Sequence, residues 1–304
     1  MIDRLINAID ERENPTVVGL DPTYEMIPEF MRAQKIDSYG KTPKAVAEMF
    51  VAFNKAIIDA VSDIVPAVKP QIAMYEKYGI EGLEAYMETT RYAKEKGLIV
   101  IGDIKRGDIS STAAAYAGHL AGVEIEGEFY DPWHEDAVTL NPYMGYDGIA
   151  PFIKVCNERD KGLFILVKTS NPSGGEIQDL VADGLPVYRH VAALVEKWGA
   201  EAMGTMGYSR LGAVVGATYK EQGAELRSAM PHTFFLVPGY GAQGASGKDL
   251  KDFFDSAGRG VIVNSSRGII AAFKNDAEFG ENDFALAARK AAIAMKIDLE
   301  SAWI

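Results

Sequence analysis

The stretch LIVIGDIKRGDI, residues 98–109, joins an apolar run to a group of charges at its carboxyl end. Its first four residues are large, aliphatic and partly β-branched, which favours a strand. A continuous apolar run of this length is typical of a strand that is buried on both faces, as in a parallel sheet. Asp103, Lys105 and Asp108 follow where this strand ends. The stretch therefore predicts a buried strand that carries ionisable side chains to one edge of a sheet.

Runs of the same kind recur along the chain, separated by longer stretches with helical spacing such as 43–63, 82–96, 186–198 and 248–256. The eight predicted strands are residues 16–21, 67–72, 98–105, 137–141, 163–169, 213–217, 233–238 and 261–265. Strands that alternate with helices form parallel sheets, and eight such units in 304 residues are typical of a (β/α)8 barrel. A doubly wound sheet is the alternative. We predict an α/β protein with a single domain, a TIM barrel over residues 1–304.

The chain is acidic, with 43 Asp and Glu against 31 Lys and Arg and a net charge of −12. This charge repels phosphate backbones and no basic stripe offsets it, so we expect no nucleic-acid partner. No apolar run approaches the ~20 residues of a membrane span, so we expect no membrane association. The first residues lack the apolar block of a signal peptide, and the single cysteine, Cys156, cannot form an internal disulfide. These features favour a cytoplasmic protein.

Charged side chains occur where the first three predicted strands end. Asp21 ends the first strand, Lys69 lies in the second, and the third carries Asp103 and Lys105. Strand side chains alternate between two faces, so Asp103 and Lys105, two residues apart, point to the same side. Asp108 follows in a turn from which it can bend back. A salt-bridge network that only holds the barrel together is the alternative, but such networks are costly to desolvate. We interpret the charges as a catalytic array at the face where barrels build active sites.

The lysine of this array has a definable chemistry. Flanking carboxylates favour the charged form of Lys105. A charged lysine is a proton donor and a poor Schiff-base nucleophile, which would need desolvation or cationic neighbours instead. Lys105 is therefore suited to deliver a proton to carbon as a carbanion develops.

The loops after the seventh and eighth strands suggest a phosphate site, which barrels frequently build there. Gly239, Gly241 and Gly244 allow backbone amides to approach an anion closely. Arg267 carries a planar guanidinium that suits phosphate oxygens, and Gln243 can close over it. The second half of the chain thus predicts an anion-binding end for the same pocket.

Residues 103–109, DIKRGDI, followed by Thr112, closely resemble the Asp-x-Lys-x-x-Asp signature of orotidine 5′-phosphate decarboxylases. VGLDP (18–22) and VKPQ (68–71) are similar to the family's first- and second-strand motifs. TLNPY (139–143) and KTSNPS (168–173) are similar to its longer, type 2 branch. Related sugar-phosphate enzymes share the first signature, whereas the ordered set, which spans nearly the whole chain, is highly specific.

This resemblance implies a lyase without cofactor or metal that converts orotidine 5′-monophosphate to UMP and CO2, the last step of pyrimidine synthesis. It implies that Lys105 protonates C6 as CO2 leaves and that Asp103 lies beside the departing carboxylate. It further implies a homodimer with shared active sites, in which Asp108 and Thr112 reach into the partner's site.

The resemblance also implies a set of substrate-binding residues. Asp21 and Lys69 would bind the ribose hydroxyls, and Lys69 would extend the charged catalytic array. Ser170 would recognise the pyrimidine amide at the start of a lid over residues 170–185. The phosphate would be held by Gln243 and Arg267 with nearby backbone amides, and the remaining residues implied are Asn141, Gly241 and Gly268. Segments 22–42 and 170–185 are longer than in compact family members.

Two other functions stay open at this point. One is a magnesium-dependent sugar-phosphate decarboxylase or aldol synthase of the same extended family, which carries an acidic residue at the second strand. Lys69 occupies that position here and repels a dication, and the four histidines lack ligand spacing, so we predict no metal site. The other is a non-catalytic phosphosugar-binding barrel, although all the candidate catalytic residues are present.

Overall fold

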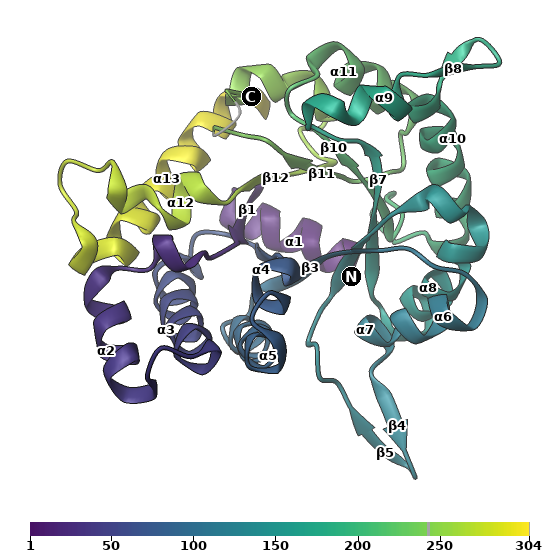
Figure 1. The fold of residues 1–304 in the computed structure, drawn as a ribbon. Coiled ribbons are helices and arrows are strands. Elements are labelled where there is room, and N and C mark those ends of the chain that lie inside the picture. The colour runs from purple at the N-terminus through teal and green to yellow at the C-terminus, as the bar shows by residue number, and fades with distance from the viewer. Residues whose placement is uncertain (242–243, 304) are drawn as a thin grey trace.

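The computed structural model describes residues 1–241 and 244–303. Eight parallel strands form a closed barrel in the order β1-β12-β11-β10-β7-β6-β3-β2, with helices around it (Figure 1). The barrel strands are β1 (Thr16–Leu20), β2 (Ala67–Pro70), β3 (Ile99–Arg106), β6 (Ala137–Leu140), β7 (Gly162–Lys168), β10 (Leu211–Val215), β11 (Phe235–Pro238) and β12 (Val261–Ser265). Each predicted run supplies one of them, which confirms the (β/α)8 barrel.

The α-helices range from single turns to twenty residues. They are α1 (Ile2–Arg12), α2 (Glu29–Tyr39), α3 (Pro43–Val61), α4 (Ile72–Glu76), α5 (Gly79–Glu95), α6 (Ser110–Tyr116), α7 (Gly118–Ala121), α8 (Tyr146–Arg159), α9 (Gly175–Gln178), α10 (Val187–Gly199), α11 (Lys220–Ala229), α12 (Arg267–Ile270) and α13 (Phe284–Trp303). Within the described residues, none of them is long and apolar enough to cross a membrane. The predicted helix at 248–256 is instead a 3₁₀ helix, Gly247–Phe253.

Two hydrophobic layers explain why the strand sequences are apolar almost throughout. Inward-facing side chains such as Val17, Phe164 and Ile262 fill the barrel interior. The alternate residues, such as Val18 and Val263, pack outward against the helices. Both faces of each strand are therefore buried, as in other parallel sheets.

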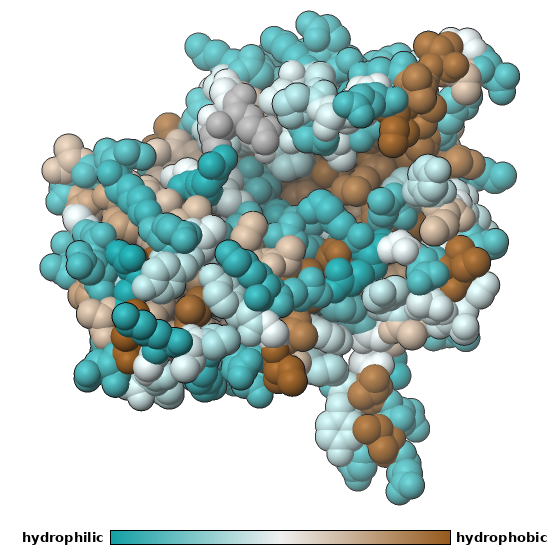
Figure 2. All heavy atoms as spheres, in the orientation of Figure 1, coloured by the Kyte–Doolittle hydropathy of each residue, from teal (hydrophilic) through white to brown (hydrophobic). Residues whose placement is uncertain are grey.

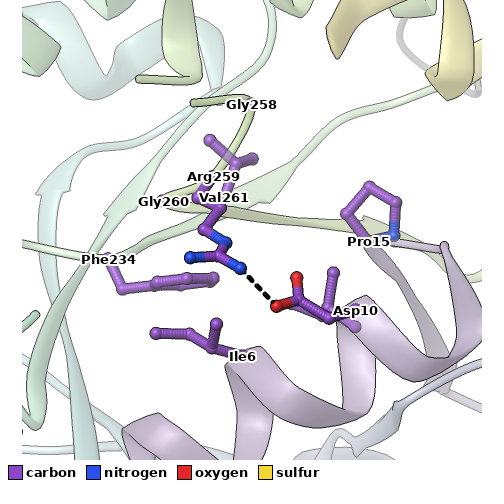
Figure 3. A pocket seen from close by; sticks show the side chains of 9 residues that line it. Ile6, Asp10, Pro15, Phe234, Gly258, Arg259, Gly260 and Val261 are labelled. Atoms are coloured by element: carbon purple, nitrogen blue, oxygen red, sulfur yellow. Dashed lines mark hydrogen bonds and ion pairs between the residues drawn. The ribbon is translucent and has the colours of Figure 1, made fainter. Parts of the chain in front are cut away.

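Helix α1 closes the amino-terminal end of the barrel. Its buried Leu5, Ile6 and Ile9 join the interior cluster, and in Figure 1 the helix lies across the barrel behind the strands. The guanidinium of Arg259 pairs with Asp10 at 2.6 Å (Figure 3). The cavity beside this ion pair measures only about 10 Å³. A substrate must therefore enter from the opposite end.

Both long segments that follow barrel strands are folded. Segment 22–42 forms a 3₁₀ turn and helix α2, which packs on α3. Segment 170–185 contains helix α9 and leads into a small hairpin of β8 (Val181–Ala182) and β9 (Leu185–Pro186). Asp179 of this segment accepts a hydrogen bond from the buried Lys168 at 2.5 Å, and Gln178 accepts one from the Thr169 N–H at 3.0 Å. These contacts tie the segment to the end of β7. A second hairpin, β4 (Val123–Ile125) and β5 (Glu128–Tyr130), projects away from the barrel.

Candidate active site

The carboxyl ends of the strands enclose two adjoining cavities that share Lys69, Asp103 and Pro238. The first measures about 360 Å³ and is lined further by Lys105, Thr139, Leu166, Thr169, Ser170, Asn171, Val214 and Leu236. The second measures about 500 Å³ and is lined further by Asp21, Thr23, Met26, Met74, Gly239, Tyr240, Asn264, Ser266 and Arg267. In Figure 2 apolar surface is visible in the middle of this face, surrounded by polar side chains. Together the cavities have the size of a small-molecule site.

Three charged side chains meet where the cavities join. The Asp103 carboxylate accepts a hydrogen bond from Lys105 Nζ at 2.5 Å on one oxygen and from Lys69 Nζ at 2.6 Å on the other. Thr139 Oγ1 donates to the same carboxylate at 2.9 Å. The side chains of Asp103 and Lys105 thus point to the same side, as their spacing predicts. Lys69 and Asp103 are buried, while the Lys105 side chain is 45% exposed to the cavity and solvent.

Burial and charge act against each other in this cluster. Burial opposes the charge of Lys69, but the carboxylates of Asp103 and Asp21 outweigh it and raise the pKa of Lys69 above its ordinary value. Burial likewise opposes the charge of Asp103, but the two ammonium groups outweigh it and hold the pKa of Asp103 well below its usual range. Lys69 and Asp103 are therefore both ionised at neutral pH.

A β-bulge presents the array to the cavity. Strand β3 pairs with β6 at Gly102↔Val138 and next at Arg106↔Leu140, so β3 inserts two extra residues relative to its neighbour. Lys105 lies within this insertion, and its φ of 45° is in the left-handed region that non-glycine residues rarely adopt. Thr139 lies opposite and its Oγ1 accepts a hydrogen bond from the Lys105 N–H at 3.0 Å. Bulges redirect side chains next to active sites, and unusual φ values concentrate at such sites.

The second cavity also contains groups that suit an anion. Arg267 follows β12 directly and lines this cavity together with Gly239 and Tyr240. Gly239 has a φ of 102°, which requires glycine and lets the chain turn sharply at the end of β11. Gln243, the other predicted phosphate ligand, lies outside the described residues.

Several predicted residues lie away from this cavity. Asp108 is half-buried and its carboxylate accepts a hydrogen bond from the N–H of Ile109 at 2.8 Å, so it does not fold back onto Lys105. Thr112 is exposed on α6 and lines a separate hollow beside Trp133. Asn141 is exposed and caps the turn that follows β6 by accepting from the Tyr143 N–H at 3.0 Å. The exposed Gly241 and Gly268 are not among the described residues that line the two cavities.

Thr139 and Asn264 belong to the cavity but escaped the sequence prediction. Each lies two residues after an interior side chain, Ala137 on β6 and Ile262 on β12. Alternation along a strand places such residues on the same inner face. The alternation is readable from the sequence, but both side chains are neutral and precede the last residue of their strands, so neither charge nor position at the strand end distinguishes them.

Fold and site together define the class of protein: a (β/α)8-barrel enzyme with a hydrogen-bonded Lys–Asp–Lys cluster at the carboxyl ends of its strands. Residues 15–281 match the model of the orotidine 5′-phosphate decarboxylase / HUMPS family. The chain belongs to this family.

Relatives that are more than 40% identical cover nearly the whole length of the chain. The orotidine 5′-phosphate decarboxylase of Rhodopirellula baltica is 46% identical over 299 residues, which is 96% of each chain. That of Petrotoga mobilis is 43% identical over 303 residues, 99% of this chain and 98% of the relative. Among solved structures, Leishmania donovani OMP decarboxylase superposes with a TM-score of 0.69 at 29% identity, covering 96% of this chain and 98% of the other.

Proposed function

We propose that this protein is an orotidine 5′-phosphate decarboxylase, which converts orotidine 5′-monophosphate to UMP and CO2 with neither metal nor cofactor. The observation that carries the proposal is the Lys69–Asp103–Lys105 cluster on the wall of a nucleotide-sized cavity. Membership of the family supports the same conclusion. We place the reaction at the end of pyrimidine synthesis in the cytoplasm, where the single buried Cys156 stays reduced.

In the proposed reaction the bond between C6 and the substrate carboxylate breaks and its electron pair stays on C6. The ammonium of Lys105 donates a proton to that carbon, and the neutral amine then regains a proton from solvent. Asp103 accepts a hydrogen bond from the Lys105 ammonium at 2.5 Å. This bond fixes the position of the proton donor in the cavity. A positioned proton donor of this kind contributes about 10²- to 10⁴-fold to a rate.

The charge of Asp103 contributes in the ground state. A substrate carboxylate placed about 4 Å from it is repelled by about 4 kcal/mol at an effective dielectric of 20. This repulsion disappears when neutral CO2 forms. Large enzymatic accelerations correspond to roughly 20 kcal/mol, so this repulsion must act together with protonation of the carbanion by Lys105 and with the binding energy of the phosphate.

The lining of the two cavities suggests how the nucleotide is oriented. Leu166, Val214 and Leu236 give the first cavity apolar walls that suit a flat pyrimidine, with Ser170 available for its amide. The second cavity leads from Asp21 to Arg267, which suits a ribose followed by a phosphate. Lys69 and Asp103 border both cavities, so C6 would lie at their junction.

Turnover of orotidine 5′-monophosphate tests the assignment directly. We expect the nucleotide to lose its orotidylate absorbance and to release one CO2 per UMP, at a rate unchanged by EDTA. Loss of turnover on chelation would favour the magnesium-dependent alternative, for which the buried Lys69 ammonium is an unsuitable neighbour. Binding of the nucleotide without release of CO2 would favour the non-catalytic barrel.

We also propose that two copies of the chain form a dimer whose sites are shared. Asp108 and Thr112 lie on the loop and helix that follow β3, outside their own cavity. The same region exposes large apolar side chains, with Ile109 46%, Met144 51% and Tyr143 82% exposed. Exposed apolar side chains of this size favour burial against a partner. A second copy related by a twofold axis would bring Asp108 to the edge of the partner's cavity.

Mixing two inactive variants tests the shared site. Lys105→Ala and Asp108→Ala are each expected to be nearly inactive alone. After subunit exchange, half of the dimers are mixed and each carries one intact site, so about a quarter of the wild-type activity should return. The measurement is the decarboxylation rate before and after exchange, with exchange verified by native mass spectrometry. A mixture that stays inactive would place both residues in the site of one chain.

A further inference from the structure

Asn264 is a buried amide on the inner face of the barrel. It lies on β12, is 7% exposed and lines the second cavity. Its Nδ2 donates to Ser266 Oγ at 3.3 Å, whereas its Oδ1 is buried and makes no hydrogen bond within the described part of the chain. A buried carbonyl oxygen without a donor is costly, and such atoms in native proteins call for an explanation.

The cavity gives that explanation. The described chain has a small number of buried side-chain atoms without a partner, and two of them, Asn264 Oδ1 and Asp21 Oδ1, belong to residues that line this cavity. Both atoms are acceptors, so they require a ligand that donates hydrogen bonds. The phosphate of a nucleotide has only acceptor oxygens when it is ionised, whereas the hydroxyls of its sugar can donate hydrogen bonds. The sugar is therefore the part of a nucleotide that fits these two acceptors.

The neighbouring strand is shaped to leave room for this amide. A Cβ atom on Gly19 of β1 would lie 1.9 Å from Ser266 Oγ and 3.1 Å from Asn264 Oδ1. Any larger residue at position 19 would therefore collide with the Asn264–Ser266 pair. Asp21 lies two residues further along the same face of the chain. Asp21, Asn264 and Ser266 thus belong to one polar wall of the cavity that Lys69, Asp103 and Arg267 also line.

We propose that Asn264 is a specificity residue for the sugar of the nucleotide, its Oδ1 accepting a hydrogen bond from one ribose hydroxyl. This inference rests on the function proposed above and adds to it a residue that recognises the sugar. The hydrogen bond forms in the bound substrate and persists during the reaction. Its loss should therefore raise KM and leave kcat nearly unchanged.

The test compares Asn264→Leu, which has a similar volume and no acceptor, with the wild-type enzyme. The probes are UMP, 2′-deoxy-UMP and 3′-deoxy-UMP, whose dissociation constants are measured directly by isothermal titration calorimetry. We expect the wild type to bind one of the two deoxy nucleotides about five- to tenfold more weakly than UMP. Asn264→Leu should bind UMP weaker by about the same factor and should distinguish that deoxy nucleotide from UMP much less than the wild type does, the remainder being due to Asp21 and Lys69. The KM for the substrate should rise about fivefold, with kcat within about twofold of the wild type.

Asn54→Leu is the matched control, because Asn54 is also buried with an unpartnered Oδ1 but lies on α3, where its Nδ2 donates to Tyr75 of α4 and Thr89 of α5. It should lower the unfolding midpoint without changing the ratio of UMP to deoxy affinities. Asn264→Ala serves if the leucine variant does not fold. Equal weakening of all three nucleotides, or unchanged UMP binding, would overturn the role of Asn264. A wild type that binds UMP but does not decarboxylate the substrate would overturn the proposed function and leave this test readable.

Discussion

Lys105→Ala is expected to lower kcat for orotidine 5′-monophosphate by at least about 10³-fold, the middle of the range for the loss of a general acid. Lys105 is the cluster's exposed ammonium, with a side chain 45% accessible, whereas Lys69 is enclosed beside Asp103. Without it the carbanion at C6 has neither a positioned proton nor an adjacent positive charge. Affinity for UMP should change little, because the Asp21–Arg267 half of the site is intact. Steady-state kinetics and UMP inhibition measure the two effects separately.

Two further variants make this expectation specific. Lys105→Arg keeps a positive charge, but a guanidinium does not release its proton at neutral pH. It should therefore remain close to the alanine variant, which separates proton donation from charge alone. Lys154→Ala, at a lysine whose side chain is 75% exposed on α8, should retain full activity. A Lys105→Ala enzyme that keeps more than about a tenth of kcat would remove this lysine from the chemistry.

Hydrophobic pattern predicted the barrel because each of its strands is buried on both faces and is therefore apolar almost throughout. The same pattern was ambiguous at 248–256, where Leu250 and Phe253 are three residues apart. That spacing fits one face of an α-helix and also the three-residue turn of a 3₁₀ helix. The structure has the 3₁₀ form, in which Ser246 and Asp249 cap the first turn reciprocally. The hydrophobic spacing is compatible with both an α-helix and a 3₁₀ helix, and local capping and packing determine which of them forms.

At the site, the strand ends predicted that Asp21, Lys69, Asp103 and Lys105 lie close together, and the four residues line two adjoining cavities. The bulge in β3 could not be predicted, because it depends on how β3 and β6 pair rather than on either sequence alone. Asn141, predicted to bind the substrate, is exposed and lies outside the described lining of both cavities for a related reason. The chain turns immediately after β6, and the amide side chain caps that turn. Polar residues just after a strand end can stabilise a turn by hydrogen-bonding its backbone as readily as they can bind a ligand.

Asp136→Asn is expected to lower the free energy of unfolding at neutral pH by about 3 kcal/mol, at the lower end for a broken buried ion pair. Asp136 is 1% exposed and precedes β6 at the amino-terminal end of the barrel. It accepts hydrogen bonds from Lys94 at 2.8 Å, from Arg4 at 3.1 Å and from the Val100 N–H at 2.9 Å. One carboxylate thereby joins α1, α5, β3 and β6. Lys94 and Arg4 are partly exposed and can return to water, which keeps the loss near the lower end of that range.

Asp63→Asn is the matched control for the loss of an aspartate charge. Asp63 pairs with Arg289 at 2.6 Å and 2.8 Å, but its side chain is 63% exposed. Exposed ion pairs contribute less than about 1 kcal/mol. Urea unfolding at one protein concentration compares both variants with the wild type. Equal losses of unfolding free energy in the two variants would mean that the burial of Asp136 does not increase its contribution to stability.

The pH dependence of the Asp136 effect has a defined sign. Burial opposes the charge of Asp136, but Lys94, the Val100 N–H and Arg4 outweigh it, so the pKa of Asp136 in the folded protein lies below its ordinary value of 3.8. A depressed pKa stabilises the fold above the unfolded value, and that stabilisation is lost as pH falls through the folded value. The difference in unfolding free energy between wild type and Asp136→Asn should therefore be constant from pH 8 to about pH 5 and shrink below it. A difference that grows on acidification would mean that this carboxyl group is protonated in the native protein and that its contacts with Lys94 and Arg4 do not hold it ionised.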